Sequence, residues 1–391
     1  MPYASGSVPF AGLLTSLVVS LLAIGNAPAQ TPSGEFVTGR AAEAWSVWQP
    51  AMQAVLDRNA DEAERLFGEL LEQNPSPFRI ALLRHRTINK TSLGGALTLL
   101  SQDAEAGSLG ENGKAVMELL ERGDEQMLEA GDGWYFASVG RFDVSNANFK
   151  ALLSSDPDPV ALLEFTELEK KRRDVLLQLT DNAIVGDAAH DILRLLDLGE
   201  RIVKADPTRI KANIERLGGP PRAYENGEAW LKQSGEYAIP FMVEYLRDSK
   251  WRQLAGPILR ALPQIDRPAL NPLVIAIRVP DTAVKIELVR ALGQIGYRQA
   301  LPYLLQLREN VQTTDELAGA VDAALNDLRA KGTEFSDSLS AADAFYELAE
   351  AYYDDTPSLA ADPRLDFANV WYWRDDLLQN IPVPTQIFNE V

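Results

Sequence analysis

Two short stretches near the end of the chain combine aromatic and acidic side chains. Residues 352–355 read Tyr-Tyr-Asp-Asp, and residues 371–376 read Trp-Tyr-Trp-Arg-Asp-Asp. Aromatic faces beside acids are typical of carbohydrate sites, and paired carboxylates can hydrolyse glycosides. Because the spacing fixes no two carboxylates at a catalytic separation, we favour packed aromatic rings and capping or solvated acids. Tyr353, Trp371 and Trp373 remain candidate partner-binding residues.

The chain has few residues whose type and spacing could bind a metal ion or act as a catalytic nucleophile or base. The aspartates at 354, 355, 362 and 366 could offer oxygen ligands to Ca²⁺, but the glycine that a calcium-binding loop needs at its turn is missing. The chain has no Cys and only two His, His85 and His190, so a thiolate site is excluded and a histidine-based site is disfavoured. We therefore predict no catalytic residue, no metal and no cofactor.

A basic stretch lies inside this acidic chain. Residues 247–298 hold nine Lys or Arg against four acidic residues, a net charge of +5 where the whole chain carries −19. Arg260 and Arg290 fall at equivalent positions of successive helices, whose axes we expect to lie about 10 Å apart. We predict a positive stripe that docks an acidic peptide, a polysaccharide or an acidic domain, with ordinary solvated helix charges as the alternative. The candidate partner-binding residues are Lys250, Arg252, Arg260, Lys285 and Arg290.

Length and composition narrow the class of protein. The 391 residues are 46% hydrophobic, enough for several domains or one long array with a core. The net charge of −19 argues against binding of nucleic acid, because neutralising phosphates requires clustered Lys and Arg over the surface. The oligomeric state cannot be read from these features.

The N-terminus resembles an export signal. An apolar run from Leu13 to Ile24 precedes Ala27-Pro28-Ala29, which places small residues where a signal peptidase reads them. The run is shorter than the roughly 20 residues that a membrane span needs. We predict a cleaved signal over residues 1–29 and a periplasmic or extracellular location, with an uncleaved anchor as the alternative since the segment lacks Lys and Arg.

The candidate partner-binding residues lie in segments that we predict to be helical. Beyond residue 30, apolar residues recur with helical periodicity, and Pro or Gly stands at the joints. Ala261-Leu262, Ala291-Leu292 and Ala324-Leu325 each begin the last turn of a helical segment, and Ala-apolar starts at 238, 269 and 300 are spaced by 31 residues. A fixed period near 30 with two helical stretches per period predicts stacked helical hairpins.

These C-terminal units resemble short bacterial HEAT repeats over Ile210 to Leu328. The resemblance implies that Leu262, Ile265, Leu292, Ile295, Leu325 and Leu328 line a shared core. It also implies that the second helices, which carry Arg260 and Arg290, line a concave face. Proteins built in this way usually present surfaces to other molecules.

A second repeat lies in the N-terminal half. Ala63, Phe67, Leu70 and Pro75 recur as Ser145, Phe149, Leu152 and Pro157, all at an offset of 82 residues. This pattern resembles the second helix of a tetratricopeptide repeat (TPR), with Gly133 and Phe136 where that family places residues of its first helix.

The sequence thus predicts an all-α fold, an α-solenoid of stacked antiparallel helical hairpins. The expected segments are a signal peptide (1–29), TPR-like hairpins (30–205), HEAT-like repeats (206–332) and an aromatic-rich helical segment (333–391). Because residues 387–391 read as the opening of another helix, that last segment is expected either to continue as a further TPR-like array or to end in a short packed tail.

The function expected of this architecture is that of an exported, non-enzymatic scaffold or adaptor. Its partner would be a protein, an acidic one if the basic stripe makes the contact, and no membrane span is expected once the signal is removed. One alternative is a polysaccharide-active α/α enzyme or carbohydrate-binding protein that uses Asp375 and Asp376. Another is a lyase-like or chaperone-like role, by analogy with other HEAT proteins.

Overall fold

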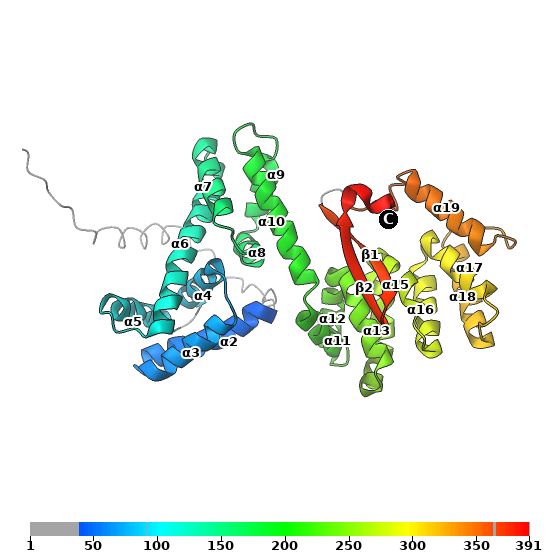
Figure 1. Ribbon diagram of the computed structural model, residues 1–391, viewed down its shortest axis with the longest axis horizontal. Coiled ribbons are helices and arrows are strands. Elements are labelled where there is room, and N and C mark those ends of the chain that lie inside the picture. Colours follow the sequence, from blue (N-terminus) through cyan, green and yellow to red (C-terminus); the bar gives the residue numbers. More distant parts are fainter. Residues whose placement is uncertain (1–38, 91, 363–364, 391) are drawn as a thin grey trace, which may run out of the picture. The chain divides into compact units, whose positions relative to one another are not determined.

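Helices dominate the computed structural model, which describes residues 39–90, 92–362 and 365–390 (Figure 1). The predicted signal at 1–29 lies outside these residues. The helices of the N-terminal half are α2 (Gly39–Leu56), α3 (Ala60–Glu72), α4 (Pro77–Lys90), α5 (Gly94–Glu105), α6 (Glu111–Ser138), α7 (Phe142–Ser154), α8 (Pro159–Glu167), α9 (Lys171–Leu179) and α10 (Gly186–Lys204).

The C-terminal half continues with helices and closes with two strands. Its α-helices are α11 (Pro207–Arg216), α12 (Pro221–Ser234), α13 (Ala238–Arg247), α14 (Ala255–Ala261), α15 (Leu270–Ala276), α16 (Thr282–Ile295), α17 (Leu301–Glu309), α18 (Asp315–Ala330) and α19 (Ala341–Tyr353). Short 3-10 helices are η2 (Gly235–Tyr237), η3 (Ser249–Leu254), η4 (Leu262–Ile265), η5 (Arg267–Ala269), η6 (Arg298–Ala300) and η7 (Thr385–Glu390). The strands are β1 (Phe367–Arg374) and β2 (Leu377–Pro384). The predicted all-α class is therefore confirmed for the described residues, apart from this one hairpin.

The 82-residue repeat is visible in the helix boundaries. Helix α7 begins and ends 82 residues after α3, and α8 begins 82 residues after α4. Ser76 and Asp158, which stand at equivalent positions before α4 and α8, contact each other: the Ser76 hydroxyl donates to the Asp158 carboxylate at 2.9 Å. The cap of one unit is thus joined to the cap of the next.

Helix pairs in this half pack closely at small residues. A Cβ on Gly133 of α6 would lie 2.3 Å from the Phe149 ring of α7, so glycine permits this approach. Phe149 is fully buried and meets Trp134 edge-on, with ring centroids 5.2 Å apart. The absence of a side chain at Gly133 therefore lets the second-helix aromatic Phe149 pack against α6.

The 31-residue period appears as three helical pairs. Ala238, Ala269 and Ala300 are all fully buried at or immediately before the starts of α13, α15 and α17. The second element of each pair is α14 with η4, then α16, then α18, and these pack on one another in that order. The six residues predicted to line the core are all buried, at 7% exposure or less.

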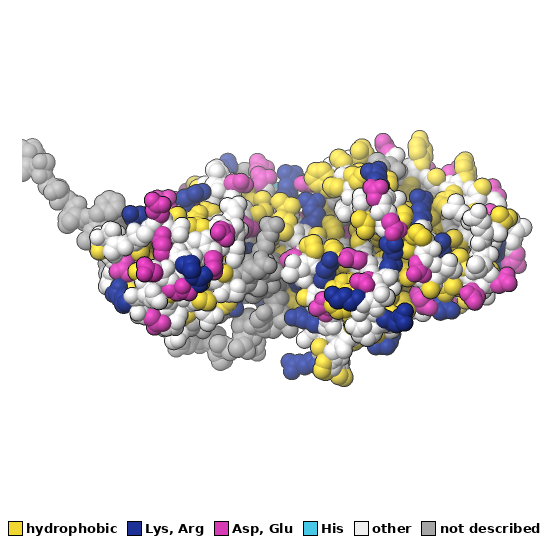
Figure 2. Space-filling view, turned by 60° about the horizontal axis from the view of Figure 1, so that its bottom comes forward, with side chains coloured by type: hydrophobic (Ala, Val, Ile, Leu, Met, Phe, Trp, Pro, Cys, Tyr) yellow, Lys and Arg dark blue, Asp and Glu magenta, His cyan; other side chains and the backbone are white. Residues whose placement is uncertain are grey.

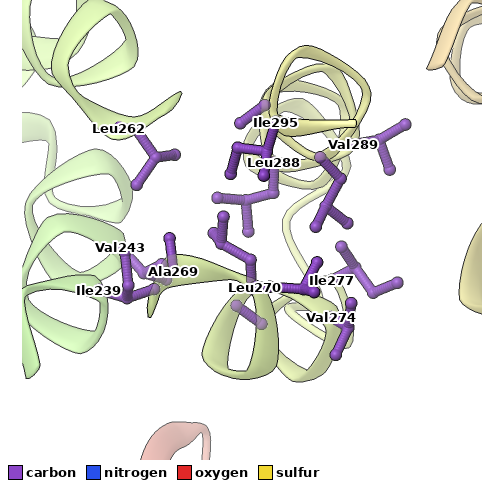
Figure 3. Packing of buried hydrophobic residues seen from close by; sticks show 14 of the residues in the cluster. Ile239, Val243, Leu262, Ala269, Leu270, Val274, Ile277, Leu288, Val289 and Ile295 are labelled. Carbon is purple, nitrogen blue, oxygen red and sulfur yellow. The ribbon is translucent and has the colours of Figure 1, made fainter. Parts of the chain in front are cut away.

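Figure 3 shows how the two helical layers share this core. Leu270 and Val274 of α15 lie close to Leu288 and Val289 of α16, and Ile239 of α13 joins them from the preceding pair. One apolar cluster runs from Ile210 to Leu378 and includes residues of both strands. Apolar burial is the main stabilising term here, at about 25 cal/mol per Å² removed from water.

The C-terminal segment departs from the expected helical fold after α19. Residues 367–384 form an antiparallel hairpin, and its two-residue turn places Asp375 and Asp376 at φ 53° and 61°. Positive φ at both central residues defines a type I′ turn, which matches the twist of paired strands. The predicted helix at the extreme end is the short 3-10 helix η7.

The hairpin folds back across α13 and α15 instead of extending the array (Figure 1). Trp371 is 5% exposed and donates its indole N–H to Glu236 Oε2 at 2.8 Å. Asn369 Nδ2 donates to Glu236 Oε1 at 2.7 Å and to the Tyr237 hydroxyl at 2.9 Å. At the other end of the hairpin, Arg247 forms an ion pair with Asp376 and donates to its carbonyl oxygen at 2.8 Å. These contacts fasten the hairpin at both ends.

Candidate functional site

A shallow depression lies where the turn between α11 and α12 meets η3 and α14. It has a volume of about 530 Å³. Leu217 and Leu254 are buried beneath it, whereas Glu215, Trp251 and Arg260 also line it. Its lining combines apolar surface with a cation and an aromatic ring, which suits recognition of an acidic side chain beside an apolar one.

Local sequence explains why the depression forms. Asp248 caps η3 by accepting a hydrogen bond from the Lys250 backbone N–H at 2.9 Å. A Cβ on Gly218 would lie 2.4 Å from the Leu254 side chain, so glycine lets the turn after α11 approach η3. Gly218 and Asp248 therefore place the two walls of the depression.

Trp251 is held as a fixed aromatic plate. Its ring stacks on Tyr245 with centroids 4.9 Å apart and an interplanar angle of 24°. The Tyr245 hydroxyl donates to Glu215 at 3.0 Å. Burial, together with this acceptor, raises the pKa of Tyr245 to about 12, so the hydroxyl stays a donor at neutral pH. A plate anchored in this way loses little side-chain freedom when a partner binds.

Two of the predicted cations lie beside aromatic rings here, and Arg252 follows Trp251 directly in the sequence. Lys250 Nζ lies 4.8 Å from the centroid of the Trp251 ring, and the Arg260 guanidinium lies 5.5 Å from that of Tyr224. Lys250, Arg252 and Arg260 are all exposed. Within the described part of the chain, no carboxylate lies within ion-pair distance of these three cations. Their charges are therefore available to a partner.

The other basic residues of the predicted stripe divide into three groups. Arg247, Arg267 and Arg298 bond to groups in residues 334–376, which fastens the C-terminal segment. Arg290 forms an ion pair with Glu287 at 2.6 Å on its own helix. Lys285 is half-buried on α16 and Arg278 follows α15, and neither has a carboxylate partner among residues 39–90, 92–362 and 365–390. Arg260 and Arg290 do lie exposed on successive second helices, as predicted.

Figure 2 shows one face of the molecule. Lys and Arg side chains are spread over the part formed by the C-terminal half, with apolar and acidic side chains between them. The positive charge is therefore interrupted by apolar and acidic side chains on this face.

The aromatic candidates lie away from the depression. Tyr353 is 86% exposed at the end of α19. Trp371 is buried against Glu236, and Trp373 packs partly buried against the same core, with Arg247 5.6 Å from its ring centroid. Trp371 and Trp373 therefore contribute to the fold, which leaves Tyr353 as the aromatic of this group that a partner could reach.

The acids beside these aromatics also have structural roles. Asp375 and Asp376 form the hairpin turn, and Asp355 accepts a hydrogen bond from Asn389 at 2.6 Å. Among the described residues, no group of His, Asp and Glu has an arrangement that could hold a metal ion.

Two residues that matter in the structure were not identified from the sequence: Trp251, which lines the depression, and Glu236, which holds the C-terminal hairpin. Trp251 carries a signal that could have revealed it, since it is an aromatic residue between Lys250 and Arg252. Glu236 carries none, because its burial depends on strand β1, more than 130 residues later. Burial raises the pKa of Glu236 above its usual range, although the hydrogen bonds from Trp371 and Asn369 act in the opposite direction.

Comparison with known proteins gives no relative from which a role could be transferred. No protein-family model, curated protein or solved structure matches this chain. None of the described helices combines the length and apolar character that crossing a membrane requires.

Proposed function

We propose that the protein is an exported, non-enzymatic scaffold that binds an acidic segment of another protein at the depression between α11 and α14. The observation that carries this proposal is that Arg260 lines the depression together with the stacked ring of Trp251, over which Lys250 lies, and that neither cation has a carboxylate partner among the described residues. Elsewhere in the same stretch, Arg247 and Arg290 already have carboxylate partners.

The proposed contact uses two kinds of interaction. A carboxylate of the partner would bond to Arg260, and an adjacent apolar side chain would lie on Trp251 and above Leu217. Arginine presents a planar set of donors that matches a carboxylate, which favours it over lysine as the anchor. Lys250 and Arg252 would add attraction at the rim, which mainly speeds association and decreases with salt.

The repeated helical pairs also support a binding role. The proposal includes an α-solenoid in which TPR-like and HEAT-like hairpins follow one another, because successive pairs such as α16 and α18 pack side by side. Such arrays expose long surfaces relative to their length, and their function lies in the residues between the core positions.

Charge reversal with a matched control tests the proposal. The protein and a Lys250→Glu/Arg260→Glu variant would be used to capture partners from periplasmic extract, with dissociation constants then measured for the purified partner. We expect about tenfold weaker binding for the variant at low salt and a smaller difference at high salt. Arg290→Glu is the control, because this exposed cation is already paired with Glu287. Equal binding by the wild type and the double variant at low salt would overturn the proposal.

A further inference from the structure

The C-terminal hairpin has a defined hydrogen-bond register. In its type I′ turn, the Arg374 carbonyl accepts from the Leu377 N–H, so Arg374 and Leu377 form a hydrogen-bonded pair. Hydrogen-bonded and non-bonded pairs alternate along antiparallel strands. Trp373–Leu378, Trp371–Asn380 and Asn369–Pro382 are therefore non-bonded pairs, whose backbone groups point away from the partner strand.

This register closes the outer edge of β2. Pro382 and Pro384 both occupy non-bonded pairs, where a backbone N–H would otherwise point outward. Proline has no N–H to donate and is a common means of blocking an edge strand. An incoming strand therefore cannot pair along the second half of β2.

The outer edge of β1 has no such block. The outward backbone groups of Asn369, Trp371 and Trp373 have no hydrogen-bond partner within the described part of the chain. The side chains of Asn369 and Trp371 are buried beneath the sheet and hold β1 in an extended conformation. A rigid, extended strand with free donors and acceptors is the arrangement to which another strand adds.

A cation stands near each end of β1. Arg374 is exposed at the turn end, and the Arg201 guanidinium lies 5.7 Å from the centroid of the Phe367 ring at the other end. Neither arginine has an ion-pair partner among the residues that the structure describes. An added strand with a carboxylate near each end would satisfy both.

We propose that the outer edge of β1 binds an extended segment of another protein, with acidic residues at its ends, as a third strand of the hairpin sheet. A second copy of this chain would also place carboxylates, Asp366 and Asp375, at both ends of such a strand, but the net charge of −19 on each copy opposes their association. This surface is separate from the depression at Arg260, so the inference does not depend on the proposed function.

A designed peptide tests the inference with the full chain. The probe is a fluorescein-labelled ten-residue peptide of alternating threonine and valine with aspartate at both ends, and binding is measured by fluorescence anisotropy. We expect saturable binding, and at least about tenfold weaker binding when the amides that face β1 are N-methylated, because each lost hydrogen bond lowers affinity. A peptide with lysine at both ends should also bind more weakly. Equal binding by the N-methylated peptide, or no saturable binding of the aspartate peptide, overturns the inference.

Variants of β1 provide the complementary measurement. Trp373→Pro removes one outward N–H and imitates the closed edge of β2, whereas Trp373→Val shortens the same side chain and keeps that N–H. We expect at least about tenfold loss of peptide binding for Trp373→Pro relative to Trp373→Val. The Lys250→Glu/Arg260→Glu variant should bind the peptide like the wild type. If sedimentation instead shows a dimer that Trp373→Pro dissociates, the occupant is a second copy and the assigned partner is wrong.

Discussion

Trp371 donates its indole N–H to Glu236 at 2.8 Å, across 135 positions of sequence. This single contact ties a strand near the end of the chain to the turn that precedes α13. It gives the buried indole its hydrogen-bond acceptor and, together with the bond from Asn369, satisfies both oxygens of the Glu236 carboxylate. The proposed binding edge of β1 depends on it, because this contact seats the hairpin on α13 and α15.

Removing the indole N–H should weaken this attachment. Trp371→Phe keeps an aromatic ring but leaves Glu236 with one donor fewer, so we expect the free energy of unfolding to fall by about 1–3 kcal/mol. Urea denaturation followed by circular dichroism measures the loss. Tyr372→Phe is the control, because Tyr372 points to the opposite face of β1, and its effect should stay within about 0.5 kcal/mol. A variant as stable as the wild type would contradict the role given to Trp371.

The close approach of α6 and α7 predicts opposite effects at two glycines of one helix. Gly133→Ala would force a Cβ to within 2.3 Å of the Phe149 ring and should destabilise by about 1–3 kcal/mol. Gly131→Ala meets nothing within 4 Å and should stabilise by up to about 1 kcal/mol through helix propensity. Thermal and urea unfolding of the two variants distinguish these outcomes, and equal effects would rule out the steric explanation.

The ion pair between α4 and α8 offers a double-mutant cycle. The Arg79 side chain is 8% exposed and that of its partner Glu164 is 23% exposed, and burial raises the pKa of Glu164 despite the arginine beside it. Arg79→Met should cost about 3 kcal/mol, because it leaves a buried carboxylate without its cation. Arg79→Met/Glu164→Leu should recover part of that loss. If the double variant is less stable than Arg79→Met, the pair contributes more than its desolvation cost and the expectation fails.

Glu167 should make stability depend on pH near neutrality. Burial and the nearby carboxylates of Glu200 and Glu164 raise the pKa of Glu167 to about 7. A raised pKa in the folded state means that its stabilising contribution is complete below the pKa of the unfolded chain and is lost as pH rises through about 7. Glu167→Gln should therefore flatten the decline in stability between about pH 5 and pH 8. Glu105→Gln controls for the change in net charge, and parallel declines in both variants would exclude Glu167 as the source.

Local patterns predicted the helical core well. Leu262, Ile265 and Leu292 are buried as expected because a residue's place in a helical repeat determines which side it presents to the neighbouring helix. The offset of 82 residues reproduced the limits of α3 and α7 for the same reason. Whether these units belong to the HEAT and TPR families stays a prediction.

The hairpin could not be predicted from such patterns. Strand β1 has apolar or aromatic residues on both faces, so the alternation that marks a half-buried strand is missing. Its turn is Asp-Asp instead of the more usual Asn-Gly or Asp-Gly, and β2 contains Pro382 and Pro384. The burial of Trp371 follows from a contact with Glu236 that no local window contains.

The return of the hairpin to α13 also imposes an order of events during synthesis. The seat formed by Glu236 and Tyr237 leaves the ribosome long before residues 367–384, whereas the helical pairs need only neighbours already made. The helices can thus assemble progressively as they are synthesised. The hydrogen bonds to the Glu236 carboxylate form only after β1, more than 130 residues later, has been synthesised. Among the contacts of Glu236, those with β1 have the longest sequence separation. We therefore expect β1 to dock slowly.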